Sequence, residues 1–187
     1  MKVSWQQLLD DIYACDKCRL CGGRQNAVPG EGDAHAKLMF IGEGPGHDED
    51  VQGRPFVGRS GELLNRMIAA IGLTREQAYI CNIVKCRPPQ NRNPEPDEAQ
   101  ACLPYLRAQV ALVRPKIIVL LGSTAGRAVL GDQFRVTRDR GRWVEKKGVW
   151  FMPTYHPSAL LRDETLKRPA WEDFKAVREK IHELAGD

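Results

Sequence analysis

The sequence predicts an α/β protein in which helices cover both faces of a central, mainly parallel sheet of four strands, a three-layer α/β/α sandwich. Two observations support this prediction. Four short apolar runs lack the alternation of a half-exposed strand, as expected when both faces of a sheet are covered. Helical patterns lie between these runs, and strand–helix alternation is typical of parallel sheets. The chain is long enough for one sizeable core, so we expect a single domain over residues 1–187.

The predicted elements follow one another in this order. The strands are KLMFIG (37–42), AYICNIV (78–84), KIIVLLG (116–122) and VWFMPT (149–154). A helix over 61–72 has apolar residues at helical spacing and Gly72 as its stop. A longer helix over 96–114 has acids near its start and Arg114 near its end, which suits the helix dipole, and Pro104 inside it predicts a kink or a break. Helices over 123–131 and 171–186 complete the pattern.

The charged residues are distributed unevenly. The formal net charge is +4, from 28 Lys and Arg against 24 Asp and Glu. The stretch 85–92 holds three basic residues and no acid, and 135–147 holds six basic residues against two acids, whereas acids gather at 43–50. Basic loops around an acidic pocket suit a polyanion that lies across a catalytic site. Solvated loops on an ordinary protein explain the same charges equally well.

The opening segment MKVSWQQLLDDIY is charged and lacks the apolar core of a signal peptide, and no apolar run is long enough to span a bilayer. We therefore expect a cytoplasmic chain with reduced thiols and no membrane contact, and we expect it to be a monomer.

Four of the six cysteines have a spacing that suits metal ligands: a C-x2-C pair and a pair separated by fifteen residues, namely Cys15, Cys18, Cys86 and Cys102. A C-x2-C turn places two thiolates on one metal centre, and two further cysteines complete a four-sulfur site. Counting ligands leaves zinc and iron–sulfur open, and the wide second pair favours a [4Fe–4S] cluster. Cys21 is a competing ligand, whereas Cys81 lies in an apolar run and is interpreted as a small buried hydrophobe.

Ligands of parallel α/β sheets bind beyond the carboxyl ends of the strands, so the loops at those ends are the candidate site. After the first strand, GEGPGHDED (42–50) is predicted to be a tight loop that offers bare backbone to a neutral ring and carboxylates to water. The second strand leads into NIVKCRPPQNRNPEP, whose prolines hold a basic loop extended. Asn82, inside that strand, either bonds to neighbouring backbone or reads the edge of a base, and the sequence alone favours the first interpretation.

The fourth strand ends in PTYHPSALLR, where His156 follows directly. His156 lies at the same sheet edge as the GEGPG loop, and this position makes a catalytic role and a structural role equally plausible. Leu160 and Leu161 either start a packed helix or form an apolar wedge that unstacks a duplex.

Taken together, these segments resemble the uracil-DNA glycosylase superfamily, and most closely its family 4, the iron–sulfur enzymes. The matching pieces follow the family's order over roughly the whole domain: Cys15-x2-Cys18, GEGPGHDED, FVGRSGELLN, NIVKCRPPQNRNP with Cys86, then Cys102, and finally YHPSALLR. Each motif alone is weak, and their joint order is highly specific. The resemblance implies a [4Fe–4S] cluster rather than zinc. It also implies that uracil is flipped out of DNA and that its N-glycosidic bond is hydrolysed.

The resemblance also implies roles for individual residues. The catalytic residues would be His156, which donates to uracil O2, Glu49, which positions water, and Glu43, which excludes the methyl group of thymine. Phe56 would stack on the flipped base and Asn82 would bond its edge, within a uracil-binding set of Gly42, Glu43, Gly44, Phe56, Asn82 and His156. Leu160 would fill the hole left by the base, and Ser60 would contact a phosphate or cap the following helix. The DNA-binding set is Ser60, Arg87, Arg92, Leu160 and Arg162.

Two departures from the superfamily pattern limit this transfer. Gly44 stands where the best-studied branch has an aspartate, so water activation falls to a different acid or to backbone carbonyls. The basic insertion KRRIH, through which a related branch bonds covalently to DNA, is missing, which favours turnover over trapping. Two competing functions are a protein that binds uracil-containing DNA without cleaving it and an iron–sulfur electron carrier. The electron carrier would leave the polar strand-end loops without a use.

Overall fold

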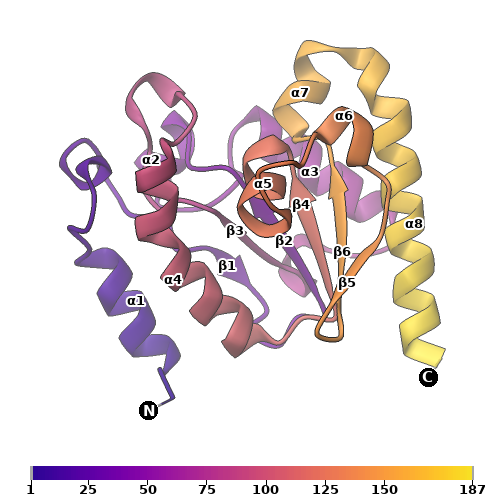
Figure 1. Cartoon of the computed structure of the whole chain (residues 1–187), viewed down its shortest axis with the longest axis horizontal. Helices are drawn as coiled ribbons and strands as arrows, with labels where there is room; N and C mark the ends of the chain where they lie inside the picture. Colours follow the sequence, from indigo (N-terminus) through magenta and orange to yellow (C-terminus); the bar gives the residue numbers. More distant parts are fainter. Residues whose placement is uncertain (1, 187) are drawn as a thin grey trace.

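A six-stranded mixed sheet forms the centre of the computed structural model, which describes residues 2–186 (Figure 1). The strand order is β1-β3-β2-β4-β6-β5. The four predicted strands form its parallel centre: β3 (Tyr79–Asn82), β2 (Leu38–Gly42), β4 (Ile117–Leu121) and β6 (Val149–Thr154). Two antiparallel edge strands, β1 (Glu31–Gly32) and β5 (Val144–Lys146), make the sheet wider than the four strands we predicted. They are too short to produce a period-two pattern in the sequence.

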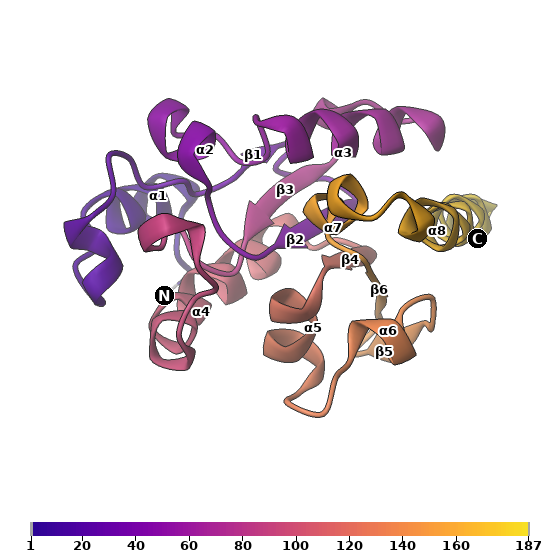
Figure 2. The same ribbon diagram turned by 90° about the horizontal axis from the view of Figure 1, so that it is seen from above.

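Successive residues of the central strands point to opposite faces of the sheet, and each face has its own apolar core. Met39 and Ile41 of β2 belong to the core that also contains buried residues of α1 (Trp5–Tyr13), α4 (Pro96–Val113) and α5 (Ser123–Leu130). Leu38 and Phe40 belong to the opposite core, with α3 (Arg59–Ala70), α7 (Pro157–Arg162) and α8 (Lys167–Gly186). Seen from above, the sheet lies between these two groups of helices (Figure 2). The predicted three-layer architecture is therefore confirmed.

The remaining helical segments are short. They are the helices α2 (His47–Gln52) and α6 (Val136–Asp139) and the 3-10 turns Arg19–Gly22, Arg75–Gln77, Pro89–Asn91 and Glu164–Leu166. The predicted loop over 42–50 is thus a loop only as far as Gly46, because α2 begins at His47 with Gly46 as its N-cap. Three acids lie in the first turn of α2, where their negative charge stabilises the positive end of the helix dipole. This stabilisation favours a helix directly after the glycine-rich segment.

Two expectations about the helices were wrong in detail. Pro104 does not split its helix, since α4 runs unbroken from Pro96 to Val113. The flanking residues Cys102, Tyr105 and Leu106 are buried, and such packing offsets the hydrogen bond that a proline cannot donate. Ser60 does not cap α3, because the N-cap is Gly58 and the helix begins at Arg59.

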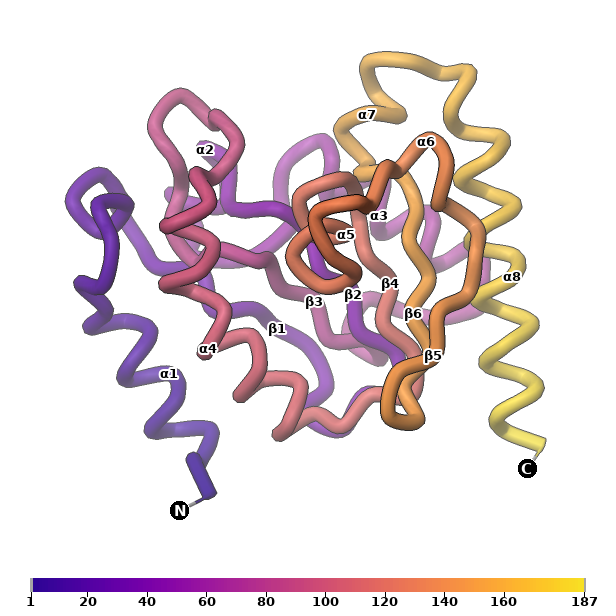
Figure 3. The backbone as a smooth tube through the Cα atoms, viewed as in Figure 1, coloured from indigo at the N-terminus to yellow at the C-terminus, as the bar shows by residue number. Residues whose placement is uncertain are grey.

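The segments that follow the parallel strands gather at one edge of the sheet. The backbone trace shows α2, which follows β2, and α7, which follows β6, at this same edge (Figure 3). None of the helices in residues 2–186 combines the length and apolar character needed to cross a membrane.

Candidate active site

A cavity of about 610 Å³ opens at the carboxyl edge of the sheet. Its walls come from the loops after β2, β3, β4 and β6 and from the segment before α3, so the site lies where parallel α/β folds bind ligands. Of the residues proposed from the sequence, the cavity is lined by Glu43, Gly44, Glu49, Phe56, Ser60, Asn82, Arg92, His156 and Arg162.

Asn82 presents an unsatisfied acceptor to this cavity. The residue is 1% exposed, and within residues 2–186 its Oδ1 atom has no hydrogen-bond partner. A buried polar atom without a partner is costly, and in native structures it commonly marks a site where a ligand supplies the missing group. The interpretation that Asn82 bonds to neighbouring backbone is therefore wrong for Oδ1.

Gly42 leaves room for two of these side chains. It is the parallel ladder partner of Asn82. A Cβ atom on Gly42 would lie 2.5 Å from Asn82 Oδ1 and 2.5 Å from Cζ of Phe56, so only glycine fits between them. Phe56 is 4% exposed and adopts a φ of 49°, a left-handed conformation that is strained for a bulky residue. A flat aromatic wall and an amide edge thus meet at the end of β2 and β3.

His156 stands opposite Phe56, with ring centroids 5.5 Å apart and planes inclined by 30°. It is the N-cap of α7, and its Nδ1 atom accepts from the Ser158 backbone N–H at 3.1 Å and lies 2.7 Å from Ser158 Oγ. Burial, followed by the positive charge of Arg162, lowers the pKa of His156 to about 4. The ring is therefore neutral near pH 7, and because Nδ1 is an acceptor its proton is on Nε2, where it can be donated.

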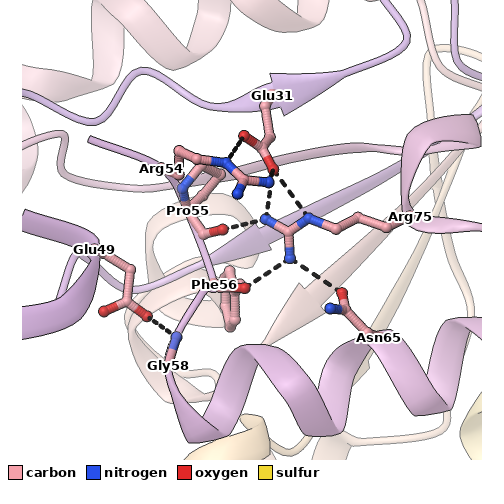
Figure 4. Close-up of polar contacts among 8 residues, drawn as sticks. All are labelled: Glu31, Glu49, Arg54, Pro55, Phe56, Gly58, Asn65 and Arg75. Carbon is pink, nitrogen blue, oxygen red and sulfur yellow. Dashed lines mark hydrogen bonds and ion pairs between the residues drawn. The ribbon is translucent and has the colours of Figure 1, made fainter. Parts of the chain in front are cut away.

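The acids after β2 take different positions. Glu43 accepts a hydrogen bond from the Thr124 hydroxyl. Glu49 lines the cavity, and its Oε1 atom accepts a hydrogen bond from the backbone nitrogen of Gly58 at 3.5 Å (Figure 4). Asp50 is instead 1% exposed and accepts hydrogen bonds from the backbone of residues 25 and 26. Asp50 is thus a structural neighbour of Glu49 rather than a second carboxylate of the cavity.

Several basic residues expected to face DNA have other partners. Arg92 forms an ion pair with the buried Glu98, at 2.7 Å. Arg87 donates to Asn91 at 2.7 Å and carries no acidic partner among the described contacts. In the second basic stretch, Arg140 is paired with the buried Asp173. The unpaired positive charge is therefore smaller than the sequence suggested.

Leu160 does not project toward solvent. It is 1% exposed and belongs to the core beneath α3 and α8, which fits the alternative in which this segment starts a packed helix. In this conformation it cannot enter a duplex, whereas its neighbour Leu161 is only partly buried.

A second cavity, on the far side of β3, is lined by the four cysteines predicted as ligands together with Cys21. Arg24 donates from Nη1 to Cys86 Sγ at 3.2 Å and to the Cys15 carbonyl at 2.8 Å, so a cation lies where thiolate charge would need balancing. Burial raises the pKa of Cys102 to about 11 and also raises that of Cys86. Buried thiols of this kind favour the thiolate form only when a metal binds.

In the part of the chain that the structure describes, the side chains of the cysteine cavity are not preassembled around a metal ion. Within residues 2–186 no three metal-ligating side chains are arranged to hold one metal ion. Sulfurs that share one zinc at about 2.3 Å would have to lie within about 4 Å of one another. Cys81, by contrast, is fully buried in the core as predicted.

The sequence reasoning missed three contributors. Thr124 follows β4 and donates a hydrogen bond to Glu43. The sequence held a signal for it, because polar residues also follow this strand, the third of the four predicted from the sequence. Lys85 is 1% exposed and donates from Nζ to the Asn82 carbonyl and to Gln109 Oε1, each at 2.7 Å, which ties the strand end to α4. Arg75 contacts the backbone at Phe56, at 2.6 Å, and no sequence pattern announces it.

Comparison with known proteins agrees with this geometry. The model of the uracil DNA glycosylase superfamily matches residues 29–175. The type-4 uracil-DNA glycosylase of Sulfurisphaera tokodaii is 47% identical over 185 residues, covering 94% of this chain and 84% of that protein. Those of Saccharolobus solfataricus and Thermotoga maritima are 43% and 45% identical, covering 93% and 91% of this chain and 85% and 91% of those proteins. The chain belongs to the uracil-DNA glycosylase superfamily, and its resemblance to the type-4 enzymes within it is confirmed.

Proposed function

We propose that this chain is a DNA repair glycosylase that flips uracil out of DNA and hydrolyses its N-glycosidic bond, leaving free uracil and an abasic site. Family membership supports the reaction class. The observation that carries the proposal for this chain is the buried, unpartnered Oδ1 of Asn82 in the strand-end cavity. The N3–H of uracil is a donor that would satisfy this acceptor. Cytosine has an acceptor at the same position and would not.

The base would stack on the Phe56 ring, with its O2 edge turned toward His156. As the glycosidic bond breaks, negative charge grows on uracil O2. The Nε2–H of His156 is a neutral donor already fixed by Ser158, and a preorganised donor in a dry pocket stabilises such charge more than water does. His156 therefore serves as the hydrogen-bond donor to the leaving base and needs no proton transfer.

Glu49 is our candidate for positioning the water that attacks the sugar carbon. Asp48 and Glu49 both line the cavity, but Glu49 is partly buried whereas Asp48 is exposed, and Asp50 is occupied by backbone N–H groups. Glu43, held by Thr124, would stand beside C5 of the ring and exclude a methyl group. Gly44 lets the loop approach, because a Cβ atom there would lie 2.7 Å from Val84 Cγ2.

We infer that Cys15, Cys18, Cys86 and Cys102 hold a [4Fe–4S] cluster, with Arg24 balancing part of its negative charge. When bound, such a cluster would cross-link the N-terminal segment to β3 and α4, and no step of the base excision depends on it. Arg87, Arg162 and Ser60 are the residues we propose for phosphate contacts. Because Leu160 is buried in the core, the partly buried Leu161 is our candidate for filling the gap left by the base. We also propose a single domain that acts as a monomer.

The test is incubation of the purified protein with oligonucleotides that differ only in carrying uracil, cytosine or thymine at one site. Free uracil and an alkali-labile site should appear with the uracil strand alone. Binding without release of uracil would instead assign a non-cleaving protein. A protein–DNA adduct stable in denaturant would assign a covalent trap. Either result would contradict the proposal.

A further inference from the structure

A mostly buried arginine outside the cavity, Arg75, holds the backbone that carries Phe56. Its Nη1 atom donates to the Phe56 carbonyl at 2.6 Å and to Asn65 Oδ1 at 3.1 Å, and its Nη2 atom donates to the Pro55 carbonyl. Its Nε and Nη2 atoms lie 3.0 and 2.9 Å from Oε1 of Glu31 (Figure 4). Four of the five guanidinium N–H donors are therefore hydrogen-bonded, and the ion pair with Glu31 holds the group from the other side.

The contacts converge on a strained point of the chain. Phe56 has a φ of 49°, which a bulky residue adopts only where its surroundings hold it. Two successive carbonyls, those of Pro55 and Phe56, are held by the same guanidinium. On the other side, Gly61 leaves room for the Phe56 carbonyl, since a Cβ atom there would lie only 1.9 Å from that oxygen. Arg75 and Gly61 together keep this backbone in its left-handed conformation.

The acid that anchors Arg75 is itself fixed by the sheet. Glu31 lies in the edge strand β1, opposite Ile80 of β3, between two glycines with φ values of 132° and 127°. Burial raises the pKa of Glu31, but the hydrogen bonds from Arg54 and Arg75 outweigh burial and lower the pKa below its ordinary value. Glu31 is therefore ionised near neutral pH. Strand β1, which carries Glu31, pairs with β3, and the last residue of β3 is Asn82.

We propose that Arg75 is a positioning residue for the reaction: its guanidinium fork holds the Phe56 ring against Gly42 and next to Asn82, as the wall on which a flat pyrimidine would stack. The proposal rests on the proposed function, because it assumes that Phe56 stacks on the base. A ring that relaxed toward ordinary φ values would move away from Gly42, against which it now packs, and the base would lose one wall of its site.

Arg54 provides a matched control. It is 53% exposed and forms an ion pair with the same Glu31, at 2.8 Å, but makes no described contact with residues 55 or 56. Arg54→Gln and Arg75→Gln therefore remove the same charge beside the same acid, and only the second releases Phe56. We expect Arg75→Gln to lower the single-turnover rate of uracil release by about 10- to 100-fold, the range for a small misplacement of a reacting group. Affinity for uracil-free DNA should be unchanged, and Arg54→Gln should keep the wild-type rate.

A double-mutant cycle separates positioning from a general loss of stability. If Arg75 acts through Phe56, then Arg75→Gln should have little further effect on the rate in a Phe56→Ala background. Equal fold-losses in the two backgrounds would overturn the proposal. So would a wild-type rate in Arg75→Gln alone.

If Arg75→Gln does not fold, Arg75→Lys decides the matter. Lysine keeps a charge beside Glu31, but it cannot reach Pro55, Phe56 and Asn65 at once. We expect a melting temperature close to that of wild type and a rate at least about fivefold lower, whereas a wild-type rate would overturn the proposal. Failure of the wild-type protein to release uracil would refute the proposed function instead, so the two failures can be told apart.

Discussion

Replacing His156 with alanine should separate the chemistry of the cavity from its fold. The variant loses one donor, Nε2–H, aimed at the site where negative charge develops, and it loses the N-cap of α7. Loss of one oxyanion donor lowers rates by about 100- to 1,000-fold. Loss of a helix cap costs only about 1 kcal/mol of stability. We therefore expect a rate lowered by two to three orders of magnitude, roughly, in a protein that still folds and binds DNA.

The pKa of His156 adds a second, independent expectation. Burial and Arg162 lower it from 6.5 to about 4, so the unfolded chain binds this proton more tightly than the folded protein does. Above about pH 6.5 this histidine does not lower the free energy of unfolding. As the pH falls from 6.5 toward 4, the free energy of unfolding decreases by about 3 kcal/mol in total, because the unfolded chain takes up the proton and the folded protein does not. The rate of uracil release should consequently show no histidine titration between about pH 5.5 and 8.

The assay is single-turnover cleavage of a uracil oligonucleotide with enzyme in excess, at several pH values, together with thermal unfolding at the same pH values. His35→Ala is the control, because His35 is an exposed histidine outside the cavity. A His156→Ala rate within about threefold of wild type would refute the assigned donor role. A wild-type rate that halves near the ordinary histidine pKa of about 6.5 would refute the argument that the ring is neutral.

Three further outcomes are expected. The purified protein should be brown and hold about four irons per chain. Cys21→Ala should keep the iron and the visible absorbance. Alanine at any one of the four proposed ligands should remove both; these ligands are Cys15, Cys18, Cys86 and Cys102. A colourless protein with one zinc would exclude the cluster. Arg87→Ala should reduce the slope of log affinity against log salt by about 1, whereas Arg92→Ala should chiefly lower the melting temperature, because Arg92 neutralises the buried Glu98. Equal slope changes in the two variants would contradict this assignment. Glu43→Ala should slow uracil release and raise thymine release in paired oligonucleotides, since a rigid wall excludes a methyl group better than a missing contact does; unchanged rates on both would place the gate elsewhere.

The parallel centre of the sheet could be predicted because its strands are buried on both faces and therefore read as continuous apolar runs. The same reasoning predicts a ligand site at the carboxyl ends of the strands, where the cavity lies. It also brought together Glu43, Asn82 and His156, which are far apart in the sequence but line one cavity. The positions of these residues at one sheet edge follow from periodicity and topology, whereas their roles are what the resemblance to the uracil-DNA glycosylases implies.

The unpredicted parts depend on pairings that have no local pattern. β1 has only two residues. Its importance comes from the ion pairs of Glu31 with Arg54 and Arg75, which lie 23 and 44 positions further along the chain. Lys85 was counted as surface charge, and only the fold shows that it is buried and hydrogen-bonded to Gln109. Leu160 was considered for a role at the surface, although the helix that contains it turns its side chain into the core.

The assembly of the cavity from separate strand ends has a consequence for how activity is acquired. No contiguous fragment shorter than Glu43 to His156 holds the acid, the amide and the histidine, and β4 must pair with both β2 and β6 before these residues meet. Such long-range parallel pairing is slow compared with helix formation. During refolding from denaturant, uracil release should therefore recover later than the far-ultraviolet signal of the helices, and simultaneous recovery would contradict this order. A nascent chain would likewise gain activity only after His156 has emerged from the ribosome, so a partly synthesised chain cannot release uracil.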